Sequence, residues 1–349
     1  MKFSPVDLSP VARPLLPAPS LSDIHAAAMR IAPVAIRTPL ARLDIERVAA
    51  QGAQPSPLRE LYLKLETAQP IRSFKIRGAG NAMLSAPPSA LKNGVWTASA
   101  GNMAQGAAWV ARTLGVPCRV IVPDHAPRTK TDAIAALGAE FTKVPFEAWW
   151  QAMITHSHPG MTGMMVHPFA DTDVMAGNGT IGLELAEDQP DLDAVLVPWG
   201  GGGLALGLAS ALRAVSPRTK VYAVEVETAA PLTASMAAAK PVVVRRTQTF
   251  IDGMGSDRVS DETWPLVQGL IAGTIVVTVA QVAAALKLLV ETAGVTAEGA
   301  GAATVAAALG GRVNGVAGAS LGAARVACII SGGNINADIV STIMRGELP

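Results

Sequence analysis

Residues 194–215 read AVLVPWGGGGLALGLASALRAV, and this stretch decides the fold. Its first nineteen residues, 194–212, carry no charge and are about as long as a membrane-spanning helix. Pro198 and four consecutive glycines argue against that interpretation, because each glycine inside a helix costs about 1 kcal/mol. The stretch therefore predicts a strand, a glycine loop and a helix.

The same alternation of strand and helix recurs along the chain. Strand-like runs lie at 61–65, 95–98, 119–122, 195–197, 221–226 and 326–330, with Ala- and Leu-rich helical stretches at 105–114, 130–137, 204–215 and 279–292. Ser22 is the expected N-cap of a further helix that runs to Ile31, and the segment 237–258 is expected to loop over the surface or the site. This order predicts an α/β fold with a mainly parallel sheet.

Composition and charge restrict the classes of partner. Hydrophobic residues make up 50% of the 349 and aromatic residues only 4%, which suits buried parallel strands covered by helices. The net charge is +1 and no block of like charge occurs, so we expect neither nucleic acid nor a membrane surface as a partner. The two cysteines and a proline-interrupted N-terminus, interpreted as a flexible lead-in rather than an export signal, favour the cytoplasm.

The first motif with chemical meaning is Ser73-Phe74-Lys75-Ile76-Arg77-Gly78-Ala79, directly after the strand at 61–65. A lysine between Phe74 and Ile76 can be partly desolvated, which lowers its pKa and frees the amine to form an imine with an aldehyde cofactor. Taken alone, the motif is equally typical of a lysine that extends to solvent from the start of a helix.

The second motif, residues 97–106 with the sequence TASAGNMAQG, lies between a strand and a helix. Ser99 and Asn102 are good N-cap types, and the small residues leave backbone N–H groups open to a carboxylate. An ordinary strand-to-helix turn has the same composition.

The third motif is the glycine loop Pro198-Trp199-Gly200-Gly201-Gly202-Gly203-Leu204. Its glycines allow the backbone to fold around a phosphate, whose charge the helix dipole offsets. The loop is neither a dinucleotide fingerprint nor a Walker loop, and a tight packing turn is the alternative.

The fourth motif, Ile329-Ile330-Ser331-Gly332-Gly333-Asn334, ends the last strand. The hydroxyl of Ser331 could hydrogen-bond a pyridine nitrogen without keeping it protonated, which favours rapid β-elimination. A strand that closes on a turn is the alternative.

Together these motifs resemble the fold-type II pyridoxal-phosphate enzymes, in particular the threonine/serine dehydratase and serine racemase group, from about Asp23 to about Asp338. The resemblance implies that Lys75 holds the cofactor as a Schiff base, flanked by Phe74, and that Asn102 bonds its 3′-oxygen. It also implies that Ser331 faces the pyridine nitrogen. Further implied contacts are the phosphate with Gly200, Gly201, Gly202, Gly203 and Leu204, and the substrate carboxylate with Ser99, Ala100, Gly101, Asn102 and Met103. Glu298 matches a family position near the cofactor, although a helix-capping role is the alternative.

Departures from the family pattern refine the expected reaction. Ala100 stands where the racemases have a serine that acts as second acid and base, so dehydration is favoured over racemisation. Asn178 replaces the more usual glutamine, Met103 a histidine and Arg72 a glycine. Glu225 fits a family cation ligand, but Pro231 stands in place of its acidic partner, so no metal is predicted.

The expected molecule has two lobes: a large cofactor-binding one from 1–84 and 172–349, and a small inserted one from 85–171. No C-terminal regulatory domain is expected. The predicted activity is dehydration of L-threonine, L-serine or a similar β-hydroxy amino acid to a 2-oxo acid and ammonia, by a homodimer with pyridoxal 5′-phosphate. The alternatives are a serine or aspartate racemase, a dehydratase of 3-hydroxyaspartate or phenylserine, and a non-catalytic phosphate- or nucleotide-binding protein.

Overall fold

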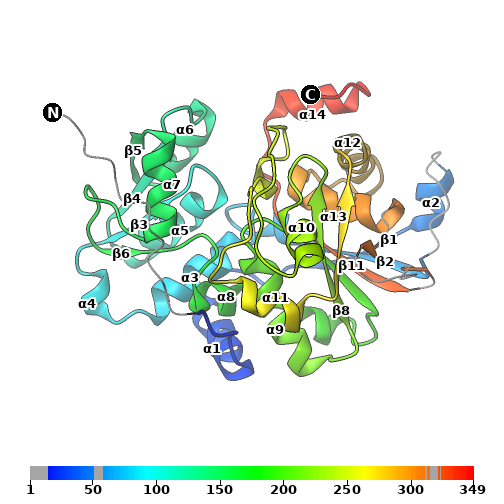
Figure 1. Cartoon of the computed structure of the whole chain (residues 1–349), viewed down its shortest axis with the longest axis horizontal. Coiled ribbons are helices and arrows are strands. Elements are labelled where there is room, and N and C mark those ends of the chain that lie inside the picture. The colour runs from blue at the N-terminus through cyan, green and yellow to red at the C-terminus, as the bar shows by residue number, and fades with distance from the viewer. Residues whose placement is uncertain (1–14, 51–57, 311–312, 315–320, 323) are drawn as a thin grey trace.

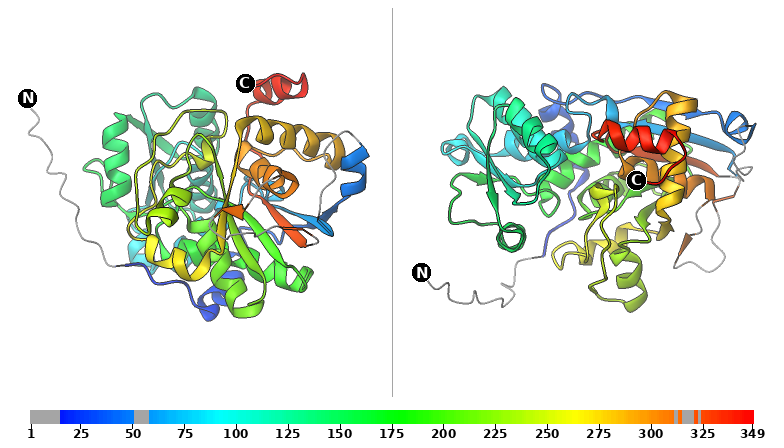
Figure 2. Two further views of the ribbon diagram at one scale, coloured as in Figure 1. Left: turned by 45° about the vertical axis from the view of Figure 1, so that its right-hand side comes forward. Right: turned by 90° about the horizontal axis from the view of Figure 1, so that it is seen from above.

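The computed structural model describes residues 15–50, 58–310, 313–314, 321–322 and 324–349. The proline-rich start expected to be a flexible lead-in (1–14) lies outside them. Two groups of strands stand apart in Figure 1 and in both views of Figure 2. Each group forms its own sheet, covered by helices, so the predicted α/β fold is confirmed.

The larger sheet is mixed. In spatial order its strands are β1 (Leu40–Leu43), β2 (Glu60–Leu65), β11 (Arg325–Ile330), β7 (Ala194–Pro198), β8 (Lys220–Val226), β9 (Gly273–Val277) and β10 (Val313–Asn314). The pairs from β2 to β9 are parallel, while β1 and β10 run antiparallel at the two edges. The last long strand of the chain therefore lies between the second and the seventh.

The smaller sheet is parallel and comes from one continuous part of the chain. Its order is β5 (Glu140–Val144), β4 (Cys118–Pro123), β3 (Val95–Ala98) and β6 (Met164–Met165). These strands lie on the left in Figure 1, with the larger sheet on the right.

Helices connect the strands and cover the sheets. They are α1 (Leu21–Ile31), α2 (Ile45–Ala50), α3 (Lys75–Ser85), α4 (Pro88–Leu91), α5 (Asn102–Leu114), α6 (Arg128–Ala136), α7 (Phe146–Thr155), α8 (Thr172–Asp188), α9 (Gly203–Val215), α10 (Pro231–Ala238), α11 (Trp264–Leu270), α12 (Val279–Leu288), α13 (Gly299–Gly310) and α14 (Ala337–Met344). Short turns of 3₁₀ helix, η1 (Glu66–Ala68) and η2 (Asp252–Met254), and a π-helical turn, η3 (Leu289–Ala293), complete the set.

Small residues set how closely the central helices pack. A Cβ atom added to Gly207 of α9 would lie 2.1 Å from the backbone oxygen of Met175 on α8, so the two backbones are in direct contact. α8 also packs against α3, and α9 packs against β7 and β8 of the larger sheet.

The predicted elements are present with small changes at their ends, and two predicted caps are wrong. Ser20, rather than Ser22, caps α1, because Ser20 and Asp23 form a reciprocal capping box. Gly101 is the N-cap of α5, so Ser99 and Asn102 do not cap it. Residues 194–212 divide into β7, the glycine loop and α9 as predicted, and no helix in the described residues is long and apolar enough to cross a membrane.

Candidate active site

Lys75 is the first residue of α3, and the segment before it is bonded to the end of β11. The Phe74 N–H donates to the backbone oxygen of Ser331 at 3.0 Å, and Ser73 forms an antiparallel bridge with Gly332. The first and fourth sequence motifs, more than 250 residues apart, are thus joined through their backbones. Arg72, in place of the family glycine, adopts a left-handed φ of 55° at the start of this segment.

The Lys75 amine is partly buried and faces a backbone carbonyl. Its Nζ donates to the oxygen of Pro168 at 2.6 Å and lies 5.1 Å from the centroid of the Phe74 ring. Burial lowers the pKa of Lys75 to about 8, although the nearby Glu298 carboxylate opposes this shift. The predicted desolvated amine is present, and a substantial fraction of it is neutral near pH 8.

His167 shapes the turn that offers this carbonyl. Its Nδ1 accepts hydrogen bonds from the N–H groups of Phe169 (3.2 Å) and Ala170 (2.7 Å), so that nitrogen carries no proton. The other ring nitrogen, Nε2, then carries the proton and donates to the backbone oxygen of Met153 at 3.2 Å. His167 is buried, and its ring also lies edge-on to the Phe169 ring in the same turn, with the ring centroids 4.6 Å apart.

The glycine loop packs against the same turn. A Cβ atom on Gly201 would lie 2.1 Å from the Phe169 ring, so a side chain at this position would collide with that ring. Gly202 has a φ of 92° and is the N-cap of α9, which no described side chain caps. The Asn178 side chain donates to the Gly203 oxygen at 3.2 Å and steadies the loop. The first turn of α9 thus presents its amide groups to an anion.

The asparagine motif leads into α5, which packs against α3, the helix that begins at Lys75. Asn102 donates from Nδ2 to both carboxylate oxygens of Glu298, at 3.0 and 2.9 Å. Ser99 accepts from the Gly101 N–H at 3.1 Å, which folds the loop ahead of α5. The Met103 side chain, however, is 1% exposed and packs in the hydrophobic core around the smaller sheet, away from any open surface.

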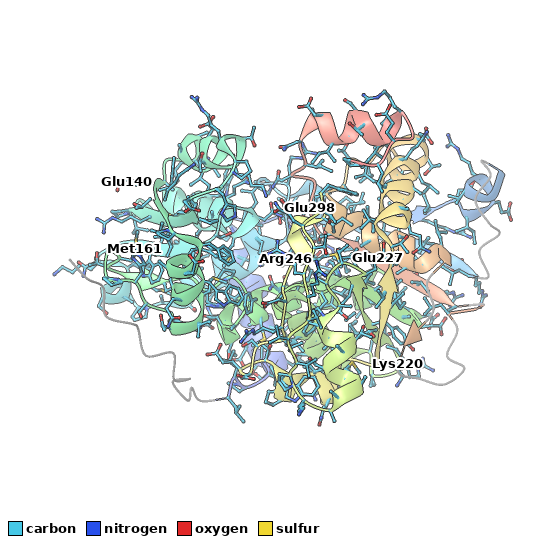
Figure 3. All side chains as sticks on the ribbon, turned by 45° about the horizontal axis from the view of Figure 1, so that its top comes forward. Glu140, Met161, Lys220, Glu227, Arg246 and Glu298 are labelled. Carbon is cyan, nitrogen blue, oxygen red and sulfur yellow. The ribbon has the colours of Figure 1, made fainter. Side chains whose placement is uncertain are left out.

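Glu298 lies near the centre of the molecule (Figure 3) and is buried. Burial raises its pKa to about 7, partly offset by the bond from Asn102. Asp252 on η2 raises this pKa further, while Lys130 on α6 and Lys75 lower it. Lys130 and Asp252 also form an ion pair, which joins α6 beside the smaller sheet to η2 beside Glu298.

A buried ionic cluster lies behind α3. Arg77 donates to the carboxylates of Glu66 and Glu184, with its side chain 1% exposed, and Lys64 contacts Glu184 at 2.7 Å. These bonds hold the first turn of α3, and therefore Lys75, against η1 and α8. Sequence patterns did not indicate this cluster, because its members come from separate parts of the chain.

Glu225, which had suggested a cation ligand, is occupied by protein donors. Its two carboxylate oxygens accept the N–H groups of Leu232 (2.7 Å) and Thr233 (2.8 Å) at the start of α10. Within the described residues, no group of three or more His, Cys, Asp or Glu side chains is arranged to hold a metal ion.

Comparison with known proteins agrees with this geometry. Residues 31–332 match the model of a family described as pyridoxal-phosphate dependent enzyme. The chain belongs to that family. It is 40% identical to an L-threonine ammonia-lyase of Geobacter sulfurreducens over 82% of this chain and 70% of the relative. A serine racemase of Oryza sativa is 32% identical over 91% of this chain and 93% of the relative. The structure of maize serine racemase superimposes with a TM-score of 0.82, at 30% identity over 95% of this chain and 98% of that one.

The residues present fit pyridoxal phosphate. Lys75 has an amine with a lowered pKa, as reaction with the aldehyde would require, and the start of α9, with no side-chain cap and lined by glycines, would suit the phosphate. Ser331 is buried at the end of β11, where a neutral hydroxyl suits an unprotonated ring nitrogen. The chain is therefore an enzyme that uses this cofactor, rather than a protein that only binds phosphate.

Proposed function

We propose that the protein is an ammonia-lyase that converts L-threonine, L-serine or a similar β-hydroxy amino acid to a 2-oxo acid and ammonia. The observation that carries the proposal is the Lys75 amine, which is partly buried, has a pKa of about 8 and donates to Pro168 O. The residue before it, Phe74, donates its backbone N–H to the oxygen of Ser331. The similarity to an L-threonine ammonia-lyase supports the reaction class.

In this proposal Lys75 would hold the cofactor through its amine, and its Nζ, once freed by the substrate amine, would remove the α-proton of the substrate. When bound, pyridoxal phosphate supplies an electron sink for the α-carbon. The N–H groups of Gly200 to Leu204 would hold its phosphate, Ser331 would bond its ring nitrogen, and Asn102 would bond its 3′-oxygen. Phe74 packs beside the Lys75 side chain. The β-hydroxyl leaves as water, and water added back releases ammonia, so the net change is loss of ammonia alone.

The substrate carboxylate is proposed to bind at the loop 99–103. Because the Met103 side chain is buried in the core, its contribution there is the backbone N–H. Ala100 has no proton to give, which supports elimination over racemisation at this site.

We also propose the arrangement around the site. Two separate sheets support a small lobe, 85–171, inserted into a large one, with the substrate between them. We propose a homodimer, from the family resemblance and the apolar composition, and a cytoplasmic location. Light scattering of the purified protein tests the dimer.

The activity is tested with a panel of amino acids on the purified, cofactor-loaded protein. Release of 2-oxo acid and ammonia is measured with L-threonine, L-serine, 3-hydroxyaspartate and phenylserine, and formation of D-isomers is followed in parallel. We expect 2-oxo acid from at least one L-substrate, and none from Lys75→Ala. D-isomer formation that outpaces 2-oxo acid release with every substrate would refute the proposal in favour of a racemase.

A further inference from the structure

Asn334 lies in the loop after β11 and reaches Asn102 of α5, 232 residues away. Its Nδ2 donates to the backbone oxygen of Ile71 at 2.9 Å and to Oδ1 of Asn102 at 2.8 Å. Asn102 in turn donates from Nδ2 to the Glu298 carboxylate. Two side-chain amides and a carboxylate are thus bonded in series, beginning at a backbone carbonyl.

The direction of every bond in this series follows from its first member. A backbone carbonyl can only accept, so the Asn334 atom beside Ile71 O is the amide nitrogen. Its second N–H points to Asn102, and the Asn102 atom that meets it must be the oxygen. The nitrogen of Asn102 is therefore on the Glu298 side. Since Ile71 O accepts at every pH, this orientation does not depend on whether Glu298 carries a proton.

We propose that Asn334 is a positioning residue, which fixes the Asn102 amide so that its NH₂ group faces Glu298 and the cofactor position. The inference rests on the proposed function only for what the Asn102 amide then does; the orientation itself rests on the hydrogen bonds.

In this orientation one of the two N–H groups of Asn102 Nδ2 has no acceptor among the described residues. Seen from Asn102 Nδ2, the two oxygens of the Glu298 carboxylate lie in nearly the same direction, whereas the two N–H bonds of Nδ2 point in widely different directions. Glu298 can therefore accept only one of these two N–H groups. No other acceptor of this nitrogen occurs among the described residues. The second N–H is available to the negatively charged 3′-oxygen of pyridoxal phosphate. A reversed amide would present lone pairs there and repel it.

Isosteric substitution separates orientation from space filling. Asn334→Asp keeps the shape but offers Asn102 only acceptors, so either this contact or the one at Glu298 becomes unfavourable. We expect the affinity of the cofactor-free protein for pyridoxal phosphate, measured by absorbance titration, to fall about ten- to a hundredfold. Asn334→Ala removes the contact to the Asn102 oxygen without adding a competing acceptor, so it should lower the affinity for pyridoxal phosphate less than Asn334→Asp does. A larger loss for Ala than for Asp would show that Asn334 acts by filling space, and would overturn the proposal.

Asn81 provides a matched control for the loss of a buried amide donor. It donates from Nδ2 to the backbone oxygen of Asp173 at 2.8 Å and accepts from Arg30, outside the series. Asn81→Asp should leave the cofactor affinity within about threefold of wild type.

A compensating substitution tests the series directly. In Asn334→Asp, Asn102 is expected to turn its oxygen toward position 298, where Gln supplies the missing donor. Adding Glu298→Gln should therefore restore part of the stability that Asn334→Asp loses in urea unfolding without cofactor, and should not stabilise Asn81→Asp. The affinity for pyridoxal phosphate should stay low in the double variant, because the reversed Asn102 amide still presents its oxygen to the cofactor position. No recovery of stability in the double variant would overturn the proposal.

Two further measurements keep the test decisive. If Asn334→Asp does not fold, Asn334→Ala is used in its place. In Asn334→Ala the Glu298 carboxylate still holds the Asn102 NH₂ group, so adding Glu298→Gln must cost more affinity than adding it to wild type, and equal costs contradict the inference. If the wild-type protein binds no pyridoxal phosphate, the proposed function is wrong. The same pairs of variants, compared by urea unfolding without cofactor, then still decide the orientation.

Discussion

Replacing Arg77 by Met removes the centre of the buried ionic cluster behind Lys75. Arg77 is 1% exposed and bonds two carboxylates, of which Glu66 is 0% exposed. Without Arg77, Glu184 still contacts Lys64 at 2.7 Å. Within the part of the chain that the structure describes, Glu66 would keep only neutral hydrogen-bond partners, the Thr38 hydroxyl and the Gln69 amide. The substitution therefore leaves one buried, uncompensated charge, for which we expect a loss of about 3–5 kcal/mol in the free energy of unfolding.

Urea denaturation at pH 7 measures this loss, with Arg77→Lys as the conservative variant. Lysine restores the charge but not the planar fork of donors, so we expect it to lose only about 1–2 kcal/mol. Adding Glu66→Gln to Arg77→Met removes the buried, uncompensated charge of Glu66 and should recover part of the lost free energy of unfolding. The reasoning fails if the free energy of unfolding of Arg77→Met lies within about 1 kcal/mol of the wild-type value. It also fails if the double variant is no more stable than Arg77→Met.

The destabilisation caused by Arg77→Met is expected to change with pH in one direction. Burial raises the pKa of Glu184, but Arg77 and Lys64 lower it more, so its net pKa lies below the usual value. In the wild type this contribution to stability is present above the unfolded-state pKa of about 4.3 and is lost as the pH falls below it. In Arg77→Met the Glu184 carboxylate loses one of the two cations that lower its pKa, so the destabilisation should be smaller at pH 5 than at pH 7.

Three further outcomes are expected. Gly201→Ala places a Cβ 2.1 Å from the Phe169 ring and should weaken pyridoxal phosphate binding at least about tenfold in an absorbance titration, while Gly269→Ala, whose nearest neighbour atom would be 3.6 Å away, should not. Because the pKa of Lys75 is about 8, the rate at which the cofactor-free protein captures pyridoxal phosphate should rise with pH and level off above 8; a rate that climbs steadily to pH 10 would show an amine of ordinary pKa. Dialysis against a chelator should leave activity unchanged, since both Glu225 oxygens are bonded to α10, and restoration of lost activity by Mg²⁺ would contradict this.

Strands with a continuous apolar run were predictable from sequence. β3 and β11 are buried along nearly their whole length and appear as Val-, Ile- and Ala-rich segments. β5 was missed because it is an exposed edge strand, with the polar sequence EFTKV and a single buried residue. Helix α3 was also missed, since Gly78 and Gly80 lower its propensity, and its stability comes from packing against α5 and α8.

The sequence by itself determined the chemical groups: an amine at Lys75, a glycine loop at 200–203 and a neutral hydroxyl at Ser331. Each is recognisable because its chemistry depends on a residue type within a short motif. Only the tertiary structure decided how these groups are oriented, because the partners are remote in the chain, with Asn102 bonded to residues 196 and 232 positions away. A local pattern carries no information about such pairs, since they meet only when two sheets and their connecting helices have packed.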